Sequence, residues 1–145
     1  MGRPCWCGGE KQNCRDIITH GSAIRVGNGR IIAAILAIDR VTIRVEGIND
    51  NACTKFHRDT VRGRLICTYD GPGTEYGIGR PKTTPTQILT VPTGCPILLT
   101  GKAWPFSSVS AQFQAMELLH RSPPISTRPI KRLVVVIDEG ATASR

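Results

Sequence analysis

The chain has 145 residues, of which 40% are hydrophobic, 21% are charged and only 5% are aromatic. A fully disordered chain would be poorer in apolar residues, so this composition excludes complete disorder and predicts one small domain with an aliphatic core. Nineteen Lys and Arg residues against eleven Asp and Glu give a net charge of +8. That excess favours an anionic partner, either nucleic acid or an acidic membrane surface, with a general solubilising role of the arginines as the alternative.

No segment of the sequence has the length and apolar character of a membrane span. The longest apolar runs, 31–38 and 133–137, fall far short of the ~20 residues that a transmembrane helix needs. The first residues also lack the apolar stretch of a signal peptide. We therefore expect a soluble, cytoplasmic protein in which the cysteines are reduced or bound to metal rather than paired in disulfides.

The N-terminal segment 1–16 is rich in cysteine and suggests a metal site. Thiolate and imidazole are the donors that zinc prefers, and three cysteines and one histidine follow one another with the spacing C-x-C-x6-C-x5-H. The predicted ligands of one zinc ion are Cys5, Cys7, Cys14 and His20. The alternative is a set of reduced thiols that bind no metal.

Residues 17–69 have the pattern of short strands and predict a small β domain. Apolar and polar residues alternate over 41–46 and again over 65–69, and this period of two predicts two strands that each have one wet face. The apolar run 31–38 is expected to be a buried strand, with a helix as the alternative. Asn28-Gly29 would then form the hairpin turn that leads into it.

The segment 70–107 is rich in glycine and proline and is expected to be largely irregular. Each proline removes a backbone donor and restricts the residue before it, which disfavours a long helix or a central strand. Two short stretches, 87–91 and 97–100, are compatible with edge strands.

The predicted helix of the chain lies near the C-terminus, over 108–121. Ser108 is a good N-cap, and apolar residues recur after it at helical spacing. A proline-containing tail, 122–145, follows and includes a possible short strand at 133–137. The expected fold class is therefore mainly β, a small twisted sheet or a partly open barrel, with one C-terminal helix and irregular Gly- and Pro-rich segments.

Sequence signatures of common enzyme classes do not fit this chain. The glycine spacings differ from those of a phosphate loop and of a dinucleotide-binding turn. The triplet His57-Arg58-Asp59 is similar to the catalytic triplet of protein kinases, but the position of the metal-binding Asn is held by Arg64. We therefore expect a protein without enzymatic activity.

Basic residues are concentrated between 55 and 64. On an extended chain Arg58, Arg62 and Arg64 have the same parity and would share one face, where three guanidinium groups could contact phosphates or a splayed base. With Lys55 they form the predicted nucleic-acid-binding set. The alternative is a solvated strand edge whose charges discourage aggregation.

Residues 17–61 resemble the carbon storage regulator (CsrA/RsmA) family of RNA-binding translational regulators. The resemblance rests on four stretches: 21–27 (GSAIRVG), the apolar run 31–38, 41–45 (VTIRV) and 56–61 (FHRDTV). It implies RNA binding, with Arg58 in the role of the arginine that contacts RNA.

The sequence thus predicts a small, basic, non-enzymatic nucleic-acid-binding protein with a regulatory role. RNA is favoured over DNA because the predicted helix carries only Arg121 as a cation. The alternative is a viral or mobile-element accessory protein that binds a host protein through the Pro-rich segments 81–96 and 122–129. A third interpretation is a chain that folds poorly because its local patterns disagree from segment to segment.

Overall fold

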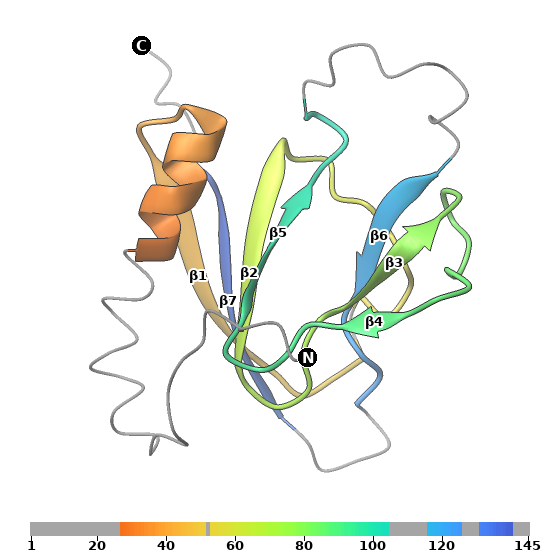
Figure 1. Ribbon diagram of the computed structural model, residues 1–145. Coiled ribbons are helices and arrows are strands. Elements are labelled where there is room, and N and C mark those ends of the chain that lie inside the picture. Colours follow the sequence, from red (N-terminus) through yellow and green to blue (C-terminus); the bar gives the residue numbers. More distant parts are fainter. Residues whose placement is uncertain (1–26, 52, 105–115, 126–130, 141–145) are drawn as a thin grey trace, which may run out of the picture.

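The computed structural model describes residues 27–51, 53–104, 116–125 and 131–140 (Figure 1). These residues form one helix, 27–36, and seven strands, and the mainly β architecture expected from the sequence is confirmed. The strands are β1 (Val41–Ile48), β2 (Gly63–Asp70), β3 (Glu75–Gly79), β4 (Leu89–Thr90), β5 (Pro96–Thr100), β6 (Glu117–Arg121) and β7 (Arg132–Glu139).

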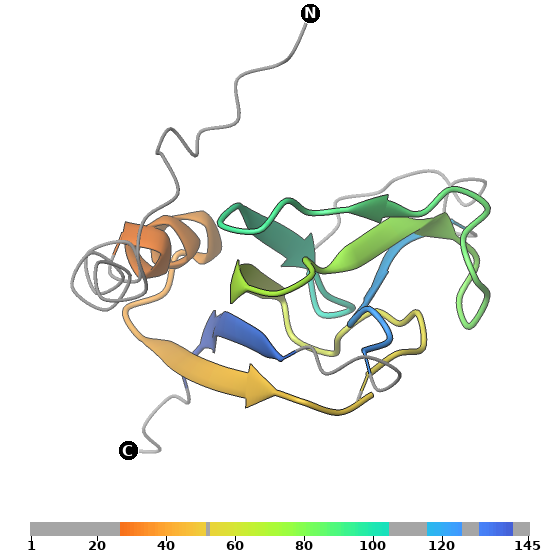
Figure 2. The ribbon, with the colours of Figure 1, turned by 90° about the horizontal axis from the view of Figure 1, so that it is seen from below.

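The strands form two antiparallel sheets that lie face to face (Figures 1 and 2). The larger sheet has the order β1-β7-β2-β5 and the smaller one the order β4-β3-β6. The helix 27–36 covers the outer face of the larger sheet, on the side away from the smaller sheet. Because β1 and β2 pair with β7, the segment 17–69 does not form a sheet of its own.

The larger sheet has an apolar face beneath the helix. Leu65 of β2, together with Val135 and Ile137 of β7, packs against Ile32 and Leu36, which lie one helical turn apart. Successive residues of a strand point to opposite sides, so the residues between these apolar positions face the smaller sheet. One face of the larger sheet therefore packs in the core beneath the helix, and the other face lines the space between the two sheets.

The apolar run 31–38 was wrongly expected to be a buried strand. Its first six residues continue the helix 27–36, which also includes Asn28-Gly29, so no hairpin turn forms there. Ile32 and Leu36 are buried, whereas the other large side chains of the helix remain exposed. The alanines of the run favour a helix, and one apolar stripe suffices to cover the sheet.

The short strands expected at 87–91, 97–100 and 133–137 are confirmed as β4, β5 and β7. The expectation of a helix over 108–121 was wrong where the structure describes it, because residues 117–121 form β6. Residues 105–115 lie outside the described residues.

Pairing with β3 decides the conformation of β6. Leu119, which is 1% exposed, lies opposite Gly77 in the register of the two strands. This long-range pairing outweighs the helical spacing of the apolar residues in the sequence. In the segment that was expected to be irregular, Gly73 allows two backbone segments to lie close together: a Cβ on Gly73 would lie 1.7 Å from the carbonyl oxygen of Val91.

No helix among the described residues is long and apolar enough to cross a membrane.

The packing of the helix against β1 can be tested by making the same substitution at two positions of the strand. Val41 and Val45 point to the same side of β1, but Val41 packs against the core beneath the helix and Val45 is 52% exposed. We expect Val41→Asp to lower the free energy of unfolding by about 2–4 kcal/mol more than Val45→Asp, because only the first change buries an unpaired carboxylate. Urea denaturation of both variants measures this difference, and equal losses would contradict the placement of the helix.

Candidate metal centre

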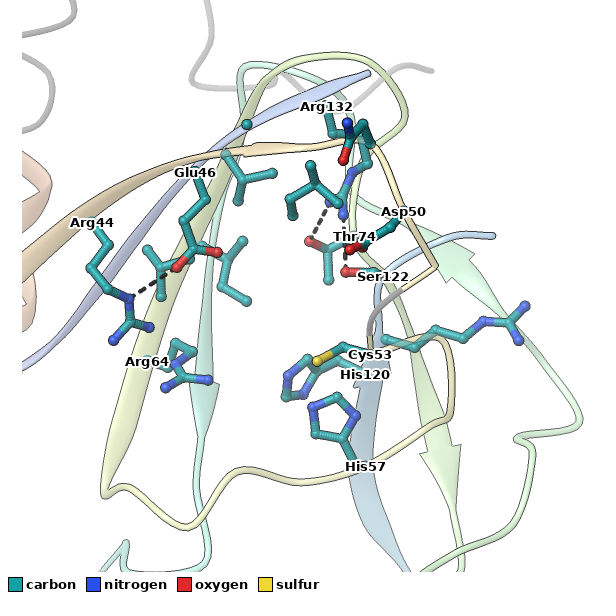
Figure 3. A pocket seen from close by; sticks show the side chains of 17 residues that line it. Arg44, Glu46, Asp50, Cys53, His57, Arg64, Thr74, His120, Ser122 and Arg132 are labelled. Carbon is teal, nitrogen blue, oxygen red and sulfur yellow. Dashed lines mark hydrogen bonds and ion pairs between the residues drawn. The ribbon is translucent and has the colours of Figure 1, made fainter. Parts of the chain in front are cut away.

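A cavity of about 600 Å³ lies between the two sheets (Figure 3). One wall is formed by the cavity-facing residues of β1, β2 and β7, and the other by β6 and the segments that flank it in space. Its lining is rich in charged and titratable side chains, which include Arg44, Arg64, His57, His120 and Arg132. Such a concentration of polar groups in one concave site is typical of a binding or catalytic site.

Two histidines and one aspartate meet in this region. The ligand atoms of His57, Asp59 and His120 all lie within 4.8 Å of one another. Nε2 of His57 is 3.7 Å from Oδ1 of Asp59, and Nε2 of His120 is 3.3 Å from Oδ2 of the same carboxylate. Bonds of about 2.1 Å place neighbouring ligands of a transition metal roughly 3 Å apart, so small shifts would close the group around an ion. This group could hold a metal ion.

An isolated β-bridge brings the two histidines together. The backbone N–H of each histidine donates to the carbonyl oxygen of the other, with both distances at 3.0 Å. The ring centroids are 4.5 Å apart. The bridge therefore fixes the segment before β2 against β6, although the two histidines are 63 positions apart in the sequence.

The tautomer of His57 is set by a backbone contact. Its Nδ1 lies 2.7 Å from the carbonyl oxygen of Lys55, an acceptor that requires Nδ1 to carry the proton. In the neutral form of the ring, which is the form that binds a metal, the lone pair is then on Nε2, on the side of Asp59. A backbone carbonyl that orients an imidazole in this way is a common outer contact of metal-binding histidines.

Asp59 is a largely buried carboxylate in a positive environment. Burial, the largest single influence, would raise the pKa of Asp59. It is outweighed by the contact with His120 and by the positive charges of His120, Arg64 and His57, so the pKa is lowered from its ordinary value of 3.8. Despite the short distance to His120, Oδ2 receives no hydrogen bond in the described part of the chain. A buried anionic oxygen without a donor is suited to a cation.

Arg132 is a second unusual group of the cavity. Its side chain is among the largest that are fully buried, and burial lowers the pKa of its guanidinium from the ordinary value, against the opposing influence of the negative charge of Glu75. An arginine nevertheless stays protonated in proteins. No carboxylate of the described residues lies within 4 Å of it. Its hydrogen-bond acceptors are all neutral: the carbonyl oxygen of Pro72 and the hydroxyls of Ser122, Thr68 and Thr74.

The residues predicted to bind nucleic acid do not form one exposed basic face. Lys55 is exposed, but the three arginines are each paired with acidic groups. Arg58 pairs with Glu117 and also donates to two backbone carbonyls. Arg62 pairs with Glu139, and Arg64 is directed into the cavity. Nucleic-acid binding stays a prediction.

The predicted zinc ligands Cys5, Cys7, Cys14 and His20 lie outside the described residues, so zinc binding at the N-terminus stays a prediction as well. Sequence analysis missed the group around Asp59. A usable signal was present, because the chain has only three histidines and one of them belongs to a His-x-Asp pair.

Comparison with known proteins gives one match. No curated protein and no solved structure matches the chain. The model of a family described as "Protein of unknown function (DUF1826)" matches residues 29–138, a range that contains the two histidines, Asp59 and Arg132. This match overturns the resemblance to the carbon storage regulator family, which relied on residues 17–61 and which no comparison supports. Since the matched range is well over half of the sequence, the chain belongs to the DUF1826 family.

Proposed function

We propose that the protein is an oxygenase that binds Fe(II) through His57, Asp59 and His120 and uses a 2-oxo dicarboxylic acid as co-substrate. The observation that carries the proposal is the meeting of two imidazoles and one carboxylate beside a cavity, which is lined by both imidazoles and by the buried guanidinium of Arg132. Two histidines and one carboxylate on one face of an ion leave the opposite positions open, which is typical of non-haem Fe(II) oxygenases.

The donor set favours catalysis over a structural role for the metal. Structural zinc sites are closed by four ligands, most of them cysteines. Here the three candidate ligands supply only nitrogen and oxygen, and they adjoin a cavity that small molecules can enter. Catalytic zinc also accepts three protein ligands and a water molecule, so the choice between zinc and iron depends on the second charged group of the cavity.

Arg132 supports a co-substrate with a carboxylate at each end. A 2-oxo acid chelates iron through its keto oxygen and the adjacent carboxylate, and its far carboxylate then needs a cation deeper in the cavity. Nη1 of Arg132 donates to the hydroxyl of Ser122, which follows His120 by two residues, so the guanidinium reaches across from β7 to the wall that carries His120. A fixed guanidinium fork that has no carboxylate within 4 Å among the described residues is well suited to the carboxylate of a ligand.

The proposed reaction balances without a further reductant. Oxidative decarboxylation of the 2-oxo acid releases CO₂ and supplies two electrons, and oxidation of a C–H bond of the substrate supplies two more. One atom of O₂ enters the new carboxylate and the other becomes the hydroxyl group of the product. In this scheme His57, Asp59 and His120 hold the metal, while Arg132 orients the co-substrate. The protein would then be an enzyme, unlike the expectation from the sequence.

The proposal is tested with metal-free protein reconstituted under anaerobic conditions. We expect one Fe(II) per chain and a visible charge-transfer band when 2-oxoglutarate is added. On exposure to O₂ without a primary substrate, slow formation of succinate should require both Fe(II) and 2-oxoglutarate. Absence of succinate, or selective binding of Zn(II) with no 2-oxoglutarate complex, would contradict the oxygenase assignment.

A further inference from the structure

We infer that Arg64 is a positioning residue that occupies one oxygen of Asp59, so that Asp59 binds the metal through its other oxygen alone. The inference rests on the metal site of the proposed function and specifies how one ligand is used. Arg64 lies on β2, and its side chain lines the same cavity as the two histidines (Figure 3).

The two oxygens of Asp59 have different surroundings. Oδ1 lies 3.0 Å from Nη1 of Arg64, within ion-pair distance. Oδ2 is buried, has no hydrogen-bond donor among the described residues, and lies 3.3 Å from Nε2 of His120. The oxygen that is left for a cation is therefore Oδ2, and it is the one beside the more buried of the two histidines.

A second carboxylate holds Arg64 in place. Nε and Nη2 of Arg64 donate to Oδ1 and Oδ2 of Asp138 at 2.6 and 3.0 Å, and the two residues lie opposite each other in the register of β2 and β7. The side chain of Asp138 is 8% exposed, and its Oδ2 also forms an ion pair with Nη2 of Arg44 at 3.0 Å. Because the guanidinium is planar and rigid, fixing one edge on Asp138 also fixes the direction of Nη1 toward Asp59.

The consequence concerns the number of open positions on the metal. With Asp59 bound through one oxygen, three positions remain on an octahedral ion, two for the 2-oxo acid and one for O₂. If both oxygens of Asp59 were bound, one of these positions would be lost. Arg64 thereby preserves the position that O₂ needs.

Neighbouring residues of β7 provide a matched pair of variants. Asp138→Asn removes the charge that anchors Arg64, whereas Glu139→Gln removes the partner of Arg62 and touches no lining residue of the cavity. The full chain is titrated anaerobically with Fe(II), and the charge-transfer band is then recorded with 2-oxoglutarate at saturating Fe(II). Arg64→Met is measured in the same way as a direct removal of the contact.

We expect Asp138→Asn and Arg64→Met to bind Fe(II) about 10–100-fold more weakly than the wild-type protein, as is usual when an outer partner of a metal ligand is removed. The band of the 2-oxoglutarate complex should also shift or weaken at saturating Fe(II), which a purely structural role of Arg64 would not cause. Glu139→Gln should match the wild-type protein in both measurements. If Arg64→Met does not fold, Asp138→Asn decides the outcome.

Two results would overturn the inference. Wild-type Fe(II) affinity and an unchanged band in folded Asp138→Asn would show that Arg64 does not direct Asp59, while the proposed function would stand. An equal loss in Glu139→Gln would reveal a general effect of breaking ion pairs at the end of β7. Failure of the wild-type protein itself to bind Fe(II) would instead refute the proposed function, and the role of Arg64 with it.

Discussion

The variant His120→Ala is expected to bind Fe(II) at least about 100-fold more weakly than the wild-type protein and to form no succinate above background. The loss should be large because His120 is the most buried of the three ligands and the one that lies closest to the free oxygen of Asp59. Its removal leaves one imidazole and one carboxylate, too few for tight binding of a divalent ion. Anaerobic titration with Fe(II) and a succinate assay measure both effects.

A cavity residue outside the ligand group provides the control for His120→Ala. Asp50 lines the same cavity but is not one of the three candidate ligands. Asp50→Asn should therefore keep Fe(II) affinity within about threefold of the wild-type value, since all three candidate ligands are retained. Tight Fe(II) binding by folded His120→Ala would contradict the assignment of the metal centre, because the remaining pair could not explain it.

The variant Arg132→Met should lose affinity for 2-oxoglutarate by about 10–100-fold, which corresponds to the loss of one charge-assisted contact in a buried site. Binding of Fe(II) should change little, because none of the three metal ligands contacts Arg132. The affinity is measured from the charge-transfer band at increasing 2-oxoglutarate concentration.

The role of Arg132 can be separated from a general disturbance of the cavity by comparing two co-substrates. 2-Oxopentanoate has the same chain length as 2-oxoglutarate but ends in a methyl group. The wild-type protein should prefer 2-oxoglutarate strongly, and Arg132→Met should lose this preference while its affinity for 2-oxopentanoate is maintained. A preference that persists in Arg132→Met would place the far carboxylate elsewhere.

The sequence was informative where local pattern and final structure depend on the same residues. The alternation around Val41 and around Leu65 predicted β1 and β2, because in each strand apolar residues alternate with polar ones and at least one of them packs in the core beneath the helix. The run 31–38 was ambiguous, since a continuous apolar segment fits a buried strand as well as a helix. Only the packing of Ile32 and Leu36 on the sheet resolves it.

The candidate site was much harder to predict. His57 and Asp59 are close in sequence, but the triplet that contains them was compared only with the kinase catalytic triplet, and only its Arg58 was given a role, in RNA binding. Their partner His120 lies beyond four further strands, and it reaches them through a bridge between backbone segments that no local pattern reveals. The isolated position of Arg132 likewise depends on which strands are neighbours, and strand pairing between distant segments is not encoded in the period of either one.

The division of β2 and β7 into two faces also makes this protein a convenient starting point for redesign. Ile66, Val134 and Val136 line the cavity, whereas Leu65, Val135 and Ile137 alternate with them and hold the helix. The first set can therefore be randomised to change the size of the cavity, while the second is kept constant to preserve the scaffold. Each randomised position would have neighbours in the sequence that pack beneath the helix and are left unchanged. Substitutions could then alter the cavity while the side chains that stabilise the fold stay the same.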